Sequence, residues 1–138
     1  MQKKINTYID STFLKTAEEM NISDSENELI VFKMLDDAIR NNYACFMIRP
    51  NYVKKVCDKI KSLKSSLKVG TVVDFPLGTR STKCKVTEAK QAISNGAYDI
   101  DFVSDYNAFK RGDFKKFDDD ITQGTDICFQ NDCIAKWI

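Results

Sequence analysis

Short apolar runs alternate along the chain with longer segments in which apolar residues recur every three or four positions. The short runs contain few polar residues and are too short for a helix, which is typical of strands buried on both faces. We therefore predict five strands. They cover residues 8–14, 43–48, 67–75, 98–103 and 134–138.

The segments between these runs predict four helices. The first is polar at its start and ends at Asn41-Asn42, and the fourth is weakened by Gly112 and Gly124. We expect the first helix to bury Ile30, Met34, Leu35, Ala38 and Ile39, the second to bury Val53, Val56, Cys57, Ile60 and Leu63, the third to bury Val86, Ala89, Ala92 and Ile93, and the fourth to cover residues 109–129.

Strands that alternate with helices in this way form β-α-β units, which give a parallel sheet with right-handed crossovers. Two α/β architectures remain open on this pattern, a doubly wound sheet and part of a (β/α)8 TIM barrel. No Gly-x-Gly-x-x-Gly follows the first strand and no Gly-x4-Gly-Lys-Ser/Thr occurs, so nucleotide-binding sheets are less favoured.

Composition excludes several classes of function. The net charge is +1, so no overall field would attract a nucleic acid or a membrane surface. The chain has no histidine, which excludes Ser-His-Asp and Cys-His catalysis and any histidine-based metal site. Its five cysteines form no Cys-x-x-Cys pair, and the N-terminus lacks a signal-peptide apolar region, so we expect a cytoplasmic protein with reduced thiols.

Polar residues interrupt the predicted strands where parallel α/β folds gather functional groups, near the carboxyl ends. Asp101 lies between Ile100 and Phe102 and so points away from both, which in a closed barrel is toward the lumen. Lys136, between Ala135 and Trp137, points the same way on the neighbouring strand. The two would pair and shift each other's pKa, either as part of a site or as a buried ion pair without a catalytic role.

Five stretches together resemble the deoxyribose-phosphate aldolase family, which belongs to the class I aldolases. Each stretch is weakly specific alone, but all five occur in order and at the spacing of barrel strands. The resemblance covers essentially the whole chain and implies strands one to five of a TIM barrel with helices outside. The stretches are YIDSTFLK (8–15), MIRPNYV (47–53), GTVVDFPLGT (70–79), EAKQAISNGAYDIDFV (88–103) and AKWI (135–138).

The resemblance also implies a function. The family is a carbon-carbon lyase of deoxyribonucleotide catabolism that cleaves 2-deoxy-D-ribose 5-phosphate to D-glyceraldehyde 3-phosphate and acetaldehyde. It uses a Schiff-base lysine and no metal or other cofactor. By this match Asp101 takes part in proton transfer and Lys136 is the strand-five lysine of the site. The substrate-pocket positions are Asp10, Thr12, Met47 (often Cys in the family) and Asp74 (usually a small or amide residue).

The Schiff-base lysine and the phosphate-binding loops of the family belong to later strands. We therefore expect residues 1–138 to be a single domain, the N-terminal portion of an aldolase barrel truncated in strand five, and to be inactive alone. A small-molecule sugar phosphate is the expected partner of the full-length family, with no nucleic acid and no membrane. The alternative is a non-enzymatic half-barrel that forms a homo-oligomer, or docks to a partner chain, through its open strand edges.

Overall fold

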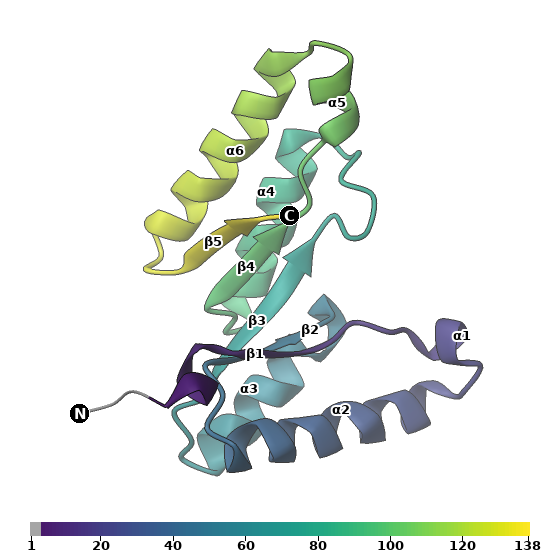
Figure 1. Cartoon of the computed structure of the whole chain (residues 1–138), viewed down its shortest axis with the longest axis vertical. Coiled ribbons are helices and arrows are strands. Elements are labelled where there is room, and N and C mark those ends of the chain that lie inside the picture. Colours follow the sequence, from purple (N-terminus) through teal and green to yellow (C-terminus); the bar gives the residue numbers. More distant parts are fainter. Residues whose placement is uncertain (1–3) are drawn as a thin grey trace.

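The computed structural model describes residues 4–138 and shows one parallel five-stranded sheet with helices packed beside it (Figure 1). The strand order is β1-β2-β3-β4-β5, so the predicted α/β fold and strand order are confirmed. All five predicted strands are present within their predicted ranges. They are β1 (Asp10–Phe13), β2 (Cys45–Ile48), β3 (Lys68–Val73), β4 (Asp99–Phe102) and β5 (Ile134–Trp137).

Every crossover between neighbouring strands contains at least one α-helix. In Figure 1, α2 and α3 lie near β1 and β2, whereas α4 and α6 lie side by side next to β4 and β5. No helix within residues 4–138 is long and apolar enough to cross a membrane. The helices are α1 (Ala17–Met20), α2 (Asp24–Arg40), α3 (Val53–Ser62), α4 (Thr82–Ser94), α5 (Tyr106–Lys110) and α6 (Phe114–Phe129), with 3-10 turns η1 (Ile5–Tyr8) and η2 (Pro50–Tyr52).

The sheet has two chemically different faces, because successive side chains of a strand point to opposite sides. The outer face packs on the helices and forms a continuous apolar core, with Phe46, Ile48, Ile100 and Phe102 fully buried. We call the opposite side the inner face. In alternation with the core residues, it carries Asp10 and Thr12 of β1, Cys45 and Met47 of β2, Gly70 and Val72 of β3, Asp99 and Asp101 of β4, and Lys136 of β5.

The first two helices begin at capping boxes. Thr16 and Glu19 form one at α1, and Ser23 and Glu26 form the other at α2, where each side chain accepts from the other residue's backbone N–H. The short helix α1 was not predicted from the sequence. The residues that α2 buries most deeply are Asn27, Val31, Leu35 and Ala38, which differ in part from the predicted set.

The predicted helix over residues 109–129 is two helices. Gly112 has φ +78°, a left-handed conformation that suits glycine and interrupts the helical hydrogen bonding between α5 and α6. Gly124 lies inside α6, where an added Cβ would come within 2.7 Å of Cζ2 of Trp137. The two glycines therefore have different roles, since the first ends a helix and the second lets α6 approach β5.

Candidate active site

Four charged side chains meet on the inner face. Lys136 donates a hydrogen bond to Oδ2 of Asp10 at 2.7 Å, and its Nζ lies 3.2 Å from Oδ1 of Asp101 and 3.3 Å from Oδ1 of Asp99. We call these four residues the inner-face cluster. The structure brings Asp10, Asp101 and Lys136 together as predicted from the sequence, and it adds Asp99.

The strand register explains why these residues meet. Asp101 lies directly opposite Lys136 on the neighbouring strand, and Asp99 is two residues earlier on the same face of β4. The sequence predicted the cluster near the carboxyl ends of the strands, but the structure does not place all four charges there. Asp10 and Asp99 are the first residues of β1 and β4, and Asp101 and Lys136 are the third residues of β4 and β5, so the cluster extends from the amino ends of the strands into the sheet.

The ion pair between Lys136 and Asp10 shows that the sheet is curved. These residues belong to the two outermost strands, β5 and β1, which would be roughly 19 Å apart in a flat five-stranded sheet. The two side chains cannot span that distance together. The sheet must therefore bend around the cluster, as the strands of a barrel do, with the charges on the concave side.

The charges of the cluster do not balance. Three carboxylates surround one ammonium group, and Oδ1 of Asp99 and Oδ1 of Asp101 are buried without a hydrogen-bond partner among the described residues, although both lie within ion-pair distance of Lys136. One carboxylate oxygen of Asp10 and one of Asp99 lie within 4.8 Å of each other. Two carboxylates at that distance repel by roughly 3–4 kcal/mol at an effective dielectric constant of about 20.

The cluster controls the protonation of Lys136. Desolvation by burial lowers the pKa of this lysine, but the hydrogen bond with Asp10 and the charges of Asp99 and Asp101 outweigh it, so the pKa is raised above its usual range. For Asp99 the balance differs, because desolvation is the largest effect and raises the pKa of its carboxyl despite Lys136. Lys136 is therefore a persistent cation, and Asp99 is reluctant to ionise.

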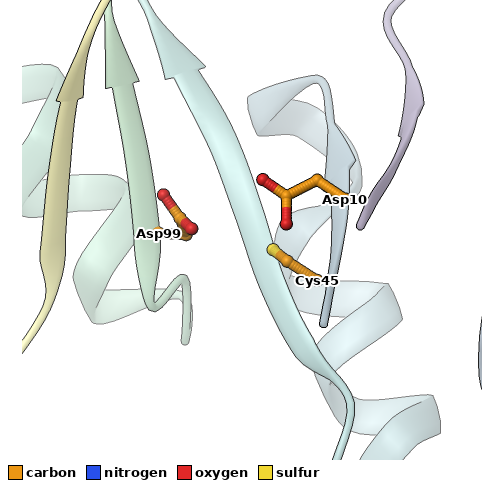
Figure 2. Close-up of side chains that lie close together, drawn as sticks. All are labelled: Asp10, Cys45 and Asp99. Atoms are coloured by element: carbon orange, nitrogen blue, oxygen red, sulfur yellow. The ribbon is translucent and has the colours of Figure 1, made fainter. Parts of the chain in front are cut away.

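Cys45, Met47 and Gly70 form the floor beside the cluster. Figure 2 shows Asp10 and Cys45 on one side of β3 and Asp99 on the other. An added Cβ at Gly70 would lie 2.5 Å from Cε of Met47 and 2.9 Å from Sγ of Cys45, so the absence of a side chain makes room for both sulfur-containing residues.

Asp10, Cys45 and Asp99 could in principle hold a metal ion, since one ligand atom of each lies within 4.8 Å of the others (Figure 2). Two features oppose this use. The Lys136 ammonium already contacts Asp10 and Asp99, and burial raises the pKa of the Cys45 thiol, with Asp99 and Asp10 adding to the effect. A metal needs the thiolate, so a lysine is the better-suited cation here.

Thr12 and Asp74 do not join the inner-face cluster. Thr12 is exposed on β1, opposite Met47 on β2. Asp74 follows β3 with φ 57°, and its Oδ2 accepts a hydrogen bond from the N–H of Arg80 and lies 3.9 Å from Nζ of Lys85. Its carboxylate is thus engaged with the β3–α4 loop and with α4, and its place in the substrate pocket stays a prediction.

A second charged group lies on the helix side and was not predicted. Lys85 is 1% exposed, and its ammonium donates to Oδ2 of Asp120 at 2.7 Å and to the carbonyl of Val103 at 2.9 Å. Asp120 also accepts from Thr82 and Lys116. We call Lys85, Asp120, Thr82 and Lys116 the helix-side network. The available signal was spacing, because Lys85 shares the i, i+4, i+7 row of Ala89 and Ala92.

The chain is similar in sequence to curated aldolases. No family model matches the chain. A deoxyribose-phosphate aldolase of Mycoplasmopsis pulmonis is 37% identical over 118 residues, covering 86% of this chain and 49% of that relative. The deoxyribose-phosphate aldolase of Thermococcus kodakarensis is 30% identical over 140 aligned positions, covering 99% of this chain and 58% of that relative.

Solved structures agree with the sequence matches. A structure from Coccidioides immitis, provisionally described as a deoxyribose-phosphate aldolase, superposes with a TM-score of 0.80 at 27% identity over 96% of this chain and 48% of that one. The chain thus spans about half the length of the relatives it matches. By sequence and by fold, the chain is a homologue of the deoxyribose-phosphate aldolases.

Proposed function

We propose that these residues supply the strand-one to strand-five part of a deoxyribose-phosphate aldolase site. The reaction is cleavage of 2-deoxy-D-ribose 5-phosphate to D-glyceraldehyde 3-phosphate and acetaldehyde. The observation that carries the proposal is the inner-face cluster, in which Lys136 contacts Asp10, Asp99 and Asp101 on the concave side of the sheet. The homology to curated aldolases supports the same reaction.

In this proposal Asp101 moves a proton during cleavage, and Lys136 provides fixed positive charge. Asp101 is suited to its part because its side chain is 16% exposed, and so reachable from the concave side, and one of its oxygens has no hydrogen-bond partner among the described residues. Lys136 is poorly suited to form the Schiff base, because its pKa is raised and an amine must be neutral to attack a carbonyl.

It follows that residues 1–138 alone should not turn over substrate. A Schiff base requires a lysine whose pKa is lowered toward neutrality, and Lys136 is shifted in the opposite direction. We propose that the nucleophile is a lysine on the later strands of the family's barrel, which residues 1–138 do not include. No metal is assigned a role, because Lys136 supplies the positive charge next to the carboxylates.

The proposal can be tested by complementation. The chain would be mixed with the separately expressed remaining half of a curated relative, and aldehyde release from 2-deoxyribose 5-phosphate would be followed with a coupled assay. We expect no activity from either half alone and activity from the mixture that Asp101→Asn or Lys136→Met reduces by about 100-fold or more. A complex that forms but stays inactive, or turnover by the chain alone with a borohydride-trapped adduct on Lys136, would contradict the proposal.

A second candidate is a half-barrel that acts by association. The sheet edges favour it, since β1 and β5 each pair with one strand only among the described residues, and such edges invite pairing with another chain. Ile134 and Ile138 beside the β5 edge are also substantially exposed. Sedimentation over a range of concentrations would reveal a defined homo-oligomer, and a persistent monomer would exclude self-association.

The expected compartment is also part of the proposal. All five cysteines are free in the structure, and Cys45, Cys57 and Cys128 are buried. Free thiols are kept reduced in the cytosol. We therefore propose a cytoplasmic location, which fractionation of the source cells would test.

A further inference from the structure

The inner-face cluster has too few hydrogen-bond donors and too little positive charge for three ionised carboxylates. The ammonium of Lys136 donates in good geometry to Asp10 alone, while Asp99 and Asp101 each keep a buried oxygen without a hydrogen bond among the described residues. A proton bound to one carboxyl would reduce the surplus charge and turn an acceptor into a donor. The three carboxyl groups differ in how readily each would bind this proton.

Burial distinguishes the three carboxyl groups. The side chain of Asp99 is 9% exposed, that of Asp101 is 16% exposed, and that of Asp10 is 33% exposed. Asp10 also has the shortest contact to the ammonium, at 2.7 Å. Water can stabilise charge on Asp10 and Asp101 more readily than on Asp99, so ionisation costs most at Asp99.

We infer that Asp99 is the carboxyl that binds the proton of the inner-face cluster, and that it acts as a positioning residue for Lys136 and Asp101. In its neutral form Asp99 fills the base of the cluster without adding a negative charge. Its role in catalysis rests on the proposed function, because it acts through Lys136 and Asp101. Its protonation does not depend on that function.

The electrostatic surroundings agree with this assignment. Burial raises the pKa of the Asp99 carboxyl, Lys136 lowers it, and the charges of Asp101 and Asp10 raise it again. The neighbouring thiols remain neutral, because burial raises the pKa of Cys45 and of Cys133 and raises that of Cys128 to about 12. Among the described residues, Lys136 is the one cation that acts on Asp99, and it also contacts the carboxylates of Asp10 and Asp101.

The assignment determines the sign of a pH effect. A carboxyl whose pKa is raised in the folded state binds its proton more tightly there than in the unfolded chain. Its contribution to stability is present below the ordinary pKa of about 3.9 and is lost as the pH rises through the raised folded value. Asp99→Asn keeps the neutral form at every pH, so this variant should gain stability relative to the parent as the pH rises.

The test compares the unfolding equilibrium constants of the 138-residue chain, Asp99→Asn and Asp10→Asn by urea denaturation from pH 3.5, just below the unfolded pKa of about 3.9, to pH 8. We expect the unfolding equilibrium constant of Asp99→Asn to fall relative to that of the parent as the pH rises. The total fall should be about tenfold for each unit that the pKa of Asp99 is raised. Asp10→Asn is the matched control and should be less stable than the parent at neutral pH, because the carboxylate that accepts the hydrogen bond from Lys136 is removed. A pH-independent ratio for Asp99→Asn, or a loss like that of Asp10→Asn, would overturn the inference.

Carboxyl 13C chemical shifts of the parent chain give an independent reading that does not need the variant to fold. Asp99 should be the last of the three carboxyl groups to ionise, and the inference fails if Asp10 or Asp101 is last. Neither measurement needs aldolase activity. Failure of the complementation assay would therefore contradict the proposed function and leave the assignment of the proton in place.

Discussion

The inner-face cluster and the helix-side network are built from the same residue types, and they differ in how well their charges are satisfied. In the network, Asp120 accepts from Lys85, Lys116 and Thr82, and it is almost fully buried. In the cluster, three carboxylates share one lysine and two oxygens lack hydrogen bonds among the described residues. A satisfied network supports the fold, whereas an unbalanced one costs stability and indicates a site.

The largest expected effect is on the helix-side network. Asp120→Asn leaves the buried Lys85 ammonium without its nearest carboxylate, and loss of one partner of a buried pair costs about 3–5 kcal/mol. The measurement is the free energy of unfolding in urea. Asp119→Asn on the same helix is the matched control, and it should cost less than about 1 kcal/mol because Asp119 and Lys115 form a surface pair. Equal losses would show that the network is not structural.

Acid should weaken this network before it affects the apolar core. Burial alone would raise the pKa of Asp120, but hydrogen bonds from Lys116, Lys85 and Thr82 outweigh it and lower the pKa. The stabilisation is present above the unfolded value of about 3.9 and is lost as the pH falls through the lower folded value. Asp120→Asn should lack this acid-dependent loss, and identical acid profiles for the variant and the parent would count against the assignment.

An intermediate effect is expected where α6 meets β5. Gly124→Ala places a Cβ 2.7 Å from the Trp137 ring and 3.2 Å from Cε1 of Phe102, and these two rings stack on each other at 4.7 Å. We expect a loss of about 1–3 kcal/mol from overpacking. Gly70→Ala on the inner face is the comparison, and it should cost less because the nearest atom is the flexible end of Met47. The reverse order would contradict the packing described for the two faces.

A smaller effect is expected from Lys136→Met. The lysine side chain is 36% exposed, so solvent screens the change and we expect a loss of about 1–2 kcal/mol at neutral pH. Without the ammonium the three carboxylates repel, and the loss should shrink as acid protonates them. Urea denaturation at pH 7.5 and at pH 5 measures both values, and a loss that grows in acid would contradict this account.

The sequence was sufficient for the strands and for most of the inner-face cluster. Apolar runs located all five strands, and period-two alternation put Asp101 and Lys136 on one face. The same alternation also puts Asp99 there, two residues before Asp101, but its importance depends on burial, which spacing alone does not reveal. Contact between Asp10 and Lys136 depends on curvature of the whole sheet, which no local pattern contains, so only the resemblance to a barrel family placed Asp10 near Lys136.

The contacts of Lys85 and Asp74 could not be predicted from local sequence patterns. Lys85 is hydrophilic, and its burial would destabilise the fold if α6 did not bring the carboxylate of Asp120 against α4. The resemblance places Asp74 at the substrate pocket, but its contacts with the backbone N–H of Arg80 and with Lys85 could not be predicted from the sequence. Both outcomes depend on tertiary contacts between segments distant in the sequence.

We propose that the inner-face cluster serves a site and does not hold the fold together. The most direct test replaces all four charges at once, as Asp10→Asn, Asp99→Asn, Asp101→Asn and Lys136→Met, and measures the free energy of unfolding at pH 7.5. We predict that the combined variant is at least as stable as the parent chain, because the surplus charge and its desolvation cost are removed together. A loss of more than about 2 kcal/mol would show that the cluster is structural and would contradict the account.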